Sequence, residues 1–201
     1  AAGADCIAVA MSAGAVQRGE VPILPESVRV RAALASGADL IAALPAPYAC
    51  AGAEAFAAAG VRLLAALGCD TLAFGAETPD AARLTDAARL LLSEKINDEL
   101  RKNLDAGQTF AAARAAAAEA VCPGMGALLR EPNNILGVEY CKAILTQNAA
   151  LTPLPLPRLG TGHGGTTGQH GAVAMASAGY LRTLPVADWA PFVPASAQEL
   201  Y

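Results

Sequence analysis

The sequence is short of charged residues, and of positive charge in particular. Only 16% of its 201 residues are charged, and the formal net charge is −4. This balance excludes a strongly basic nucleic-acid surface over the chain as a whole. It remains compatible with an RNA substrate that is held by a local patch.

Long apolar runs are missing as well. No stretch reaches the roughly 18 residues of a membrane-spanning helix, so we expect no contact with a membrane. The opening residues Ala1–Asp5 lack the basic segment of a signal peptide. The cysteines are odd in number, at five, and form no C-x-x-C pair, which excludes zinc and dithiol sites by spacing. We therefore expect free thiols in a reducing compartment, the cytoplasm.

Histidines and familiar catalytic motifs are equally scarce. The two histidines, His163 and His170, lie seven positions apart and match no metal-ligand pattern. We expect no protein-held metal. The chain contains no Walker A motif, no Ser-His-Asp order, no paired-carboxylate motif and no G-x-G-x-x-G after a strand. The catalytic residues are left unassigned for this reason.

Aromatic residues make up only 4% of the chain, whereas hydrophobic residues make up 54%, and alanine is the most frequent of them. Alanine is the best helix former, so this composition favours many closely packed helices. The length suits one domain spanning residues 1–201.

A short repeat built on Gly-x-Asp precedes three apolar runs, Cys6–Ala10, Leu40–Leu44 and Thr71–Phe74. Such short, continuous runs are typical of strands buried on both faces. Each glycine suits the position after a helix, where a positive φ is needed. Gly3 would then end a helix that precedes Ala1, so we expect a βα unit before the chain begins.

Helical patterns fill the intervals, over Glu26–Ser36 and Gly52–Leu67. Strands that alternate with helices indicate βαβ crossovers and a parallel sheet. The predicted fold class is therefore α/β, a doubly wound, Rossmann-like parallel sheet with added helices.

The second half of the chain is predicted to be mostly helical. Thr78 is expected to cap a helix, with Pro79 as its first residue. A leucine-rich stripe with a spacing of four predicts one long helix that includes Leu84–Leu104 and ends at Gly107. The remaining predicted elements are a helix over Thr109–Val121, a helix opened by Pro132, an edge strand over Leu151–Pro157, a loop over Gly160–Gly171 and a short helix over Met175–Leu184.

Ligands of doubly wound sheets bind beyond the carboxyl ends of the strands. Ser12 and Gly75 lie at such ends. Gly75 either lets a ligand approach the backbone closely or is a simple turn residue. Asn133 and Asn134 follow Pro132 in the first turn of its helix, where an amide either reads a nucleobase edge or satisfies local backbone groups.

Arg158 precedes a glycine-rich stretch that contains Gly160 and Gly162. Exposed amides and an arginine fork would hold a phosphate; alternatively, the stretch is a flexible connector. Ser177 and Arg182 flank a short predicted helix. They would bind an anion there, or act only as a cap and a solvated side chain.

Several segments, in the same order, match the motifs of one family. They include Met11–Glu20 (against M-S-G-N-F-V-Q-R-G-E), Leu44–Tyr48 (L-P-x-x-Y), Phe74–Glu77 (F-G-S-E), Pro132–Tyr140 (P-N-N-I-L-G-x-E-Y) and Arg158–Gly162 (R-x-G-A-G). By these motifs the chain resembles the tRNA(Met) cytidine acetate ligases, which are similar to nucleotidyltransferases of the H-x-G-H type. The resemblance covers most of residues 4–182.

The resemblance implies that acetate is activated with ATP to acetyl-adenylate and passed to the wobble cytidine of elongator tRNA(Met). ATP, with Mg²⁺ accompanying it, acetate and tRNA(Met) are the implied partners. Carried over by position, Gly75, Asn133 and Arg158 are the expected ATP contacts. The further expected phosphate or loop contacts are Ser12, Gly160, Gly162, Ser177 and Arg182.

The chain also departs from the family. Pro25–Arg29 stands in place of the family's D-K-W-T-R, which removes an aspartate and a lysine. The H-x-G-H segment and a C-terminal helical region are expected to lie outside these residues, so we expect the 201 residues to fold but not to form an acyl-adenylate. The alternatives are another adenylyltransferase that acts on a small phosphorylated substrate, and a non-catalytic nucleotide-binding module.

Overall fold

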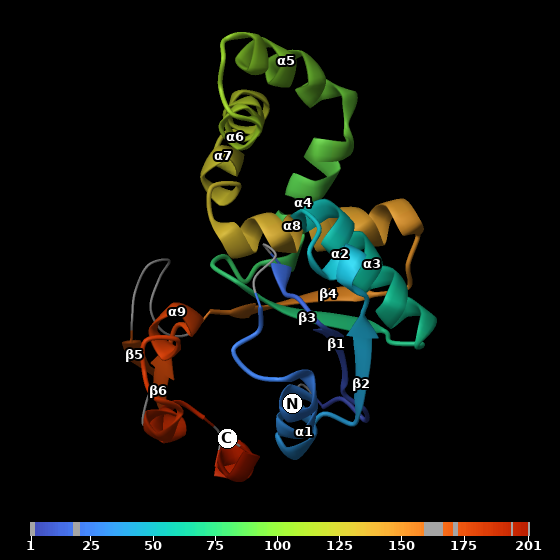
Figure 1. The fold of residues 1–201 in the computed structure, drawn as a ribbon. Helices are drawn as coiled ribbons and strands as arrows, with labels where there is room; N and C mark the ends of the chain where they lie inside the picture. Colours follow the sequence, from blue (N-terminus) through green and yellow to red (C-terminus); the bar gives the residue numbers. More distant parts are fainter. Residues whose placement is uncertain (1–2, 18–20, 159–166, 171–172, 194, 201) are drawn as a thin grey trace. The chain divides into compact units, whose positions relative to one another are not determined.

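The computed structural model describes residues 3–17, 21–158, 167–170, 173–193 and 195–200 (Figure 1). Its packing divides into two compact units. Unit 1 comprises Ala1–Cys50 with Leu159–Tyr201, and unit 2 comprises Ala51–Arg158. Parallel strands joined through helices occur in both, so the predicted α/β class is confirmed.

In unit 1, strand β1 (Ala8–Ser12) pairs in parallel with β2 (Leu40–Leu44), and helix α1 (Glu26–Ala35) connects them. β2 has the predicted bounds, but β1 begins two residues later than predicted. The Ile7 amide donates to the Asp39 carboxylate at 2.8 Å, and the Ile7 carbonyl accepts from the amide of Asp39. Ile7 is therefore held by the turn that enters β2, and the ladder starts at Ala8. The short helix α2 (Ala46–Ala49) follows β2.

The C-terminal part of unit 1 differs from the prediction. Residues Thr167–His170 form strand β5, which pairs antiparallel with β6 (Val173–Ala176). The predicted loop and the start of the predicted helix are both replaced here by this hairpin. The helix, α9 (Ala178–Leu181), begins only after Ser177, whose hydroxyl accepts the Tyr180 amide at 3.2 Å.

Two 3₁₀ segments, η3 (Val186–Phe192) and η4 (Ala195–Leu200), complete unit 1. Trp189 is buried, and its indole N–H donates to the Leu181 carbonyl at 3.1 Å. The ring of Phe192 meets that of Tyr180 edge-on, with centroids 6.2 Å apart. The C-terminal segment is thereby tied to α9.

Unit 2 contains the parallel pair β3 (Thr71–Ala76) and β4 (Thr152–Pro157). In β4 every second residue is proline, at positions 153, 155 and 157. Thr152 and Arg158 lie at the alternate positions, and their amides donate to the Asp70 and Ala76 carbonyls. The prolines therefore remove amide donors only from the side of β4 that faces away from β3, as on an edge strand. The predicted edge strand is confirmed.

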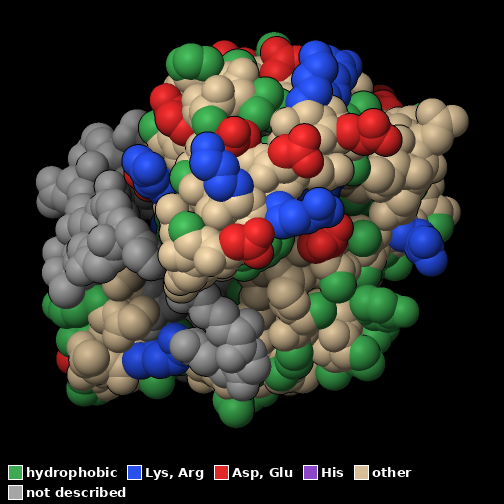
Figure 2. Space-filling model, turned by 90° about the horizontal axis from the view of Figure 1, so that it is seen from above, with side chains coloured by type: hydrophobic (Ala, Val, Ile, Leu, Met, Phe, Trp, Pro, Cys, Tyr) green, Lys and Arg blue, Asp and Glu red, His purple; other side chains and the backbone are tan. Residues whose placement is uncertain are grey.

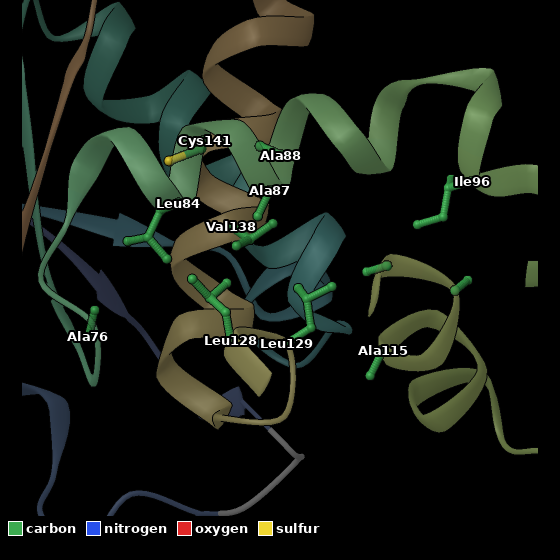
Figure 3. Packing of buried hydrophobic residues seen from close by; sticks show 12 residues of the cluster. Ala76, Leu84, Ala87, Ala88, Ile96, Ala115, Leu128, Leu129, Val138 and Cys141 are labelled. Carbon is green, nitrogen blue, oxygen red and sulfur yellow. The ribbon is translucent and has the colours of Figure 1, made fainter. Parts of the chain in front are cut away.

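Helices α3 (Ala53–Ala66) and α4 (Ala81–Leu92) pack against the central helix α8 (Pro132–Gln147), which contacts both β3 and β4 (Figure 1). The segments η2 (Glu94–Ile96), α5 (Asn97–Asp105), α6 (Phe110–Val121) and α7 (Met125–Leu128) lead from α4 to α8. The core forms where these helices meet (Figure 3). Its labelled members are Ala76, Leu84, Ala87, Ala88, Ile96, Ala115, Leu128, Leu129, Val138 and Cys141.

The single long helix predicted to end at Gly107 is wrong. The chain turns extended at Ser93, with ψ of 152°, and the Ser93 hydroxyl donates to the Leu90 carbonyl at 2.7 Å. This break lets Ile96 enter the core at 2% exposure, whereas Leu92 on the same predicted stripe is 45% exposed. The predicted stop at this glycine is confirmed, because α5 ends at Asp105 and Gly107 follows its C-cap Ala106 with φ of +81°.

The predicted Thr78 cap is also wrong. Asp80 is the N-cap of α4, and its carboxylate accepts the Arg83 amide at 3.0 Å. Thr78 has a different partner, the side chain of Asn134. Within the described ranges, no helix is both long and apolar enough to cross a membrane.

Candidate nucleotide-binding site

The carboxylate of Glu77, just beyond β3, caps the N-terminus of α8. Its Oε2 accepts the Asn134 amide at 2.8 Å, and its Oε1 accepts the Asn133 amide at 3.3 Å. The Asn133 side-chain Nδ2 also donates to Oε1, at 2.5 Å. Pro132 occupies the first turn, where its missing N–H costs nothing, and the side chain of Glu131 at the cap position does not cap the helix. A carboxylate from another element therefore satisfies this helix end.

Asn134 closes the same junction from the inside. It is only 1% exposed. Its Oδ1 accepts the Thr78 amide at 2.8 Å, and its Nδ2 donates to the Thr78 hydroxyl at 3.1 Å. Of the two roles considered for the Asn-Asn pair, Asn134 takes the structural one, because both ends of its amide are used within the protein.

Glu77 remains charged in this environment. Partial burial of the carboxyl raises its pKa. The hydrogen bonds from the Asn133 side chain and the backbone amides lower the pKa by more, so it lies below its ordinary value. A carboxylate at a helix N-terminus is also favoured by the helix dipole. The end of α8 is thus already neutralised by an anion that belongs to the protein.

Gly75 and Arg158 lie side by side at the carboxyl end of the β3–β4 pair. Gly75 is opposite Leu156 in the register, and the Arg158 amide donates to the Ala76 carbonyl at 3.1 Å. A β-carbon on Gly75 would contact the Arg158 Cγ at 3.4 Å. The absence of a side chain at position 75 therefore leaves room beside the stem of Arg158.

The guanidinium of Arg158 is exposed and, among the described residues, has neither a hydrogen bond nor an ion pair. The structure brings Gly75 and Arg158 together, and Asn133 is bonded to Glu77, two residues beyond Gly75. The three ATP contacts expected from the sequence thus share one end of the sheet in unit 2. This end offers the guanidinium of Arg158, the exposed backbone at Gly75 and the side-chain amide of Asn133, which Glu77 holds in place.

The other expected contacts belong to unit 1. Ser12 ends β1, and its carbonyl accepts from the Arg29 guanidinium at 2.8 Å. Arg29 also donates to the carbonyls of Ala13 and Leu24, at 2.5 and 3.2 Å. Arg29 is not among the contacts predicted from the sequence, although it is the arginine that remains at the place of the family's D-K-W-T-R.

Ser177 takes the capping role described above for α9. Arg182 is exposed and donates to the Val21 carbonyl at 3.4 Å. Gly160 and Gly162 lie outside the described residues, so the predicted phosphate role of the glycine-rich stretch remains a prediction.

The role of Glu77 is likewise absent from the sequence-based predictions. The available signal was its place in Phe74–Glu77, directly after a strand and in a segment that matches F-G-S-E.

In the part of the chain that the structure describes, no group of three or more His, Cys, Asp or Glu side chains is placed to hold a metal. On the face drawn in Figure 2, Lys and Arg side chains are interspersed with Asp and Glu side chains.

Comparison with known proteins identifies relatives of this chain. A tRNA(Met) cytidine acetate ligase from Syntrophotalea carbinolica is 38% identical over 181 residues, which are 88% of this chain and 43% of that protein. The crystal structure of apo Thermotoga maritima TmcAL superposes with a TM-score of 0.87 at 27% identity, over 98% of this chain and 49% of that one. The crystal form of the same protein bound with alpha-thio ATP superposes with a TM-score of 0.79 at 27% identity, over 98% of this chain and 48% of that one.

The chain spans less than half the length of each of these proteins. The resemblance inferred from the sequence motifs is confirmed. The HIGH Nucleotidyl Transferase family matches the chain over residues 1–201. The chain therefore belongs to the HIGH nucleotidyltransferase family.

Proposed function

We propose that this chain is the ATP-binding part of a ligase that activates acetate with ATP and acetylates the wobble cytidine of elongator tRNA(Met). The similarity to tRNA(Met) cytidine acetate ligases and to a TmcAL bound with alpha-thio ATP supports this proposal. The observation that carries it is the grouping of Gly75, Arg158 and Asn133 at the carboxyl end of β3 and β4. Ligands of such sheets bind at this end.

The residues present fit ATP. An arginine fork without a protein partner suits a phosphate, and a glycine beside it leaves space that a β-carbon would fill. Arg158 would hold the phosphates, and Gly75 would let the nucleotide lie against the strand. ATP supplies the adenylyl group that makes acetate reactive.

Mg²⁺ would accompany the nucleotide in this proposal. It is commonly held through substrate phosphates and water, with few protein ligands. The lack of a three-residue metal cluster among the described residues is compatible with that mode of binding. The cytoplasm is the proposed location, in keeping with five cysteines that are all free.

Calorimetry with ATP tests the nucleotide part of the proposal. Arg158→Ala should weaken ATP binding by about 1.5–3 kcal/mol, the usual contribution of a hydrogen bond to a charged group. Arg89→Ala is the matched control, because Arg89 is an exposed arginine of the same unit whose ion-pair partner among the described residues is Asp86. Unchanged ATP affinity in Arg158→Ala would show that the phosphates bind elsewhere.

A chimera tests the tRNA part. The 201 residues would replace the matching segment of Thermotoga maritima TmcAL, onto which 98% of this chain superposes. The measured product is acetylated cytidine in tRNA(Met), formed from labelled acetate with and without ATP. ATP-dependent acetylation supports the proposal, whereas a chimera that binds ATP but does not acetylate tRNA contradicts it.

A further inference from the structure

We propose that Glu77 is a positioning residue that fixes the side-chain amide of Asn133 and so makes the site select adenine over guanine. This inference rests on the proposed binding of ATP. Glu77 itself would not touch the nucleotide; it would act through Asn133.

The orientation of the Asn133 amide follows from its partner. An ionised carboxylate can only accept hydrogen bonds, so the atom of Asn133 that lies 2.5 Å from Glu77 Oε1 must be the nitrogen, Nδ2. The Asn133 backbone amide donates to the same oxygen. Two donors from one residue therefore converge on one carboxylate oxygen, and rotation of the amide by 180° would place two oxygens face to face.

The other atom of the amide, Oδ1, is left without a partner among the described residues. The next residue is different, since both Oδ1 and Nδ2 of Asn134 are bonded to Thr78. Asn134 is buried, whereas Asn133 is partly exposed. Asn134 therefore joins α8 to Thr78, whereas Asn133 presents its acceptor, Oδ1, in a fixed orientation.

The charge at this junction determines which part of a nucleotide can face it. The first amides of α8 already donate to Glu77, so they are not available to a phosphate. The negative carboxylate would also repel phosphate oxygens. Arg158, at the neighbouring position on the sheet edge, is the group that suits phosphate. The uncharged base is therefore the part of ATP that fits beside Asn133.

An acceptor held in this way distinguishes the two purines. Adenine carries a donor, the exocyclic N6 amine, where guanine carries an acceptor, O6. Oδ1 of Asn133 would accept a hydrogen bond from the N6 amine of adenine. With guanine it would lie against O6, another acceptor, and the two oxygens would repel each other. If the amide were free to rotate, Nδ2 could donate to O6 and guanine would be accepted as well.

Binding of ATP, GTP and ITP to the full chain, measured by calorimetry, tests the inference. The wild-type chain should bind ATP about tenfold more tightly than GTP or ITP, the discrimination typical of one specific base contact. Glu77→Gln leaves one acceptor oxygen for the three donors that now share two, and its NH₂ group can also donate to Oδ1 of Asn133, so the Asn133 amide is no longer held in one orientation. The ratio of GTP to ATP dissociation constants should then fall towards one.

Glu119→Gln is the matched control. Glu119 is another glutamate of unit 2 that accepts backbone amides at the start of a helix, from Gly124 and Gly126. It should keep the wild-type preference for ATP, whereas an equal loss of preference would attribute the effect to general destabilisation and overturn the inference.

The outcomes separate the two proposals. If the wild type fails to bind ATP, the proposed function itself is overturned. If ATP binds and Glu77→Gln keeps the full preference, only the role of Glu77 is overturned. The comparison of ATP with ITP in the wild type needs no variant, so equal affinities would overturn the inference even if Glu77→Gln fails to fold.

Discussion

The ring of Phe74 in β3 lies directly against the backbone of α8 at Gly137. A β-carbon at position 137 would stand 2.7 Å from Cε2 of Phe74, closer than real contacts allow. The same ring lies 5.2 Å from that of Tyr140, one turn further along α8. The glycine of the segment Pro132–Tyr140 is therefore required by close packing of helix on strand, and its asparagines by the junction with Glu77 and Thr78.

Gly137→Ala should destabilise the protein by about 1–3 kcal/mol, the usual cost of overpacking. Alanine would otherwise gain up to about 1 kcal/mol in a helix interior, so the clash with Phe74 must outweigh that gain. Gly60→Ala in α3 is the control, because its β-carbon would meet no described atom within 4 Å. Urea denaturation should show loss of stability in the first variant and a gain in the second; a gain in both would refute the close contact.

Glu139 is the buried centre of an ion network. Its side chain is 3% exposed and bonds Arg114 of α6 at 2.9 Å and Lys142 of α8 at 2.8 Å. Removal of one partner from a buried ion pair leaves uncompensated charge and typically costs about 3–5 kcal/mol. We expect a loss of this size for Glu139→Ala in denaturant unfolding.

Glu54 gives the matched comparison. It contacts the same Lys142 at 3.3 Å but is 79% exposed. An exposed ion pair contributes about 0–1 kcal/mol, so Glu54→Ala should be nearly neutral. Equal losses in the two variants would show that burial is not what makes the network strong.

The sequence predicted the elements that local chemistry determines. Gly37 and Gly68 have positive φ, as their places after helices require, and β2 and β3 follow them. The break at Ser93 was not predictable, because the stripe continues at a spacing of four through it and only tertiary packing brings Ile96 into the core. Likewise, Gly75, Asn133 and Arg158 could be chosen from motifs, but the bond between Glu77 and Asn133 joins residues 56 positions apart.

Asp80 offers a test of the corrected helix start. Its carboxylate accepts the Arg83 amide and lies at the positive end of the α4 dipole. Asp80→Ala should cost about 0.5–2 kcal/mol, the usual range for a lost N-cap. Asp86→Ala, which removes the exposed ion pair with Arg89, should change stability by less than about 0.5 kcal/mol. Similar effects of the two substitutions in thermal unfolding would contradict the assignment of the cap.

The pH dependence of stability should show directly what the Glu77 carboxylate contributes at the N-terminus of α8. The pKa of Glu77 is lowered from 4.5 in the folded protein. A carboxyl group whose folded pKa is depressed stabilises the fold above its unfolded pKa, and the contribution disappears as the pH falls through the folded value. Glu77→Gln should therefore be less stable than the wild type near pH 7, and the difference should shrink below about pH 4.5 as Glu77 takes up a proton.

Glu119→Gln should show the same trend, because the amides of Gly124 and Gly126 lower the pKa of Glu119. The measurement is urea denaturation of the three proteins at several pH values between about 3 and 7. A gap between wild type and Glu77→Gln that is independent of pH would mean that the carboxylate charge contributes nothing at this junction. The hydrogen bonds to Asn133 and Asn134 would then be no stronger than those of a neutral amide, and the fixed orientation of Asn133 would lose its physical basis.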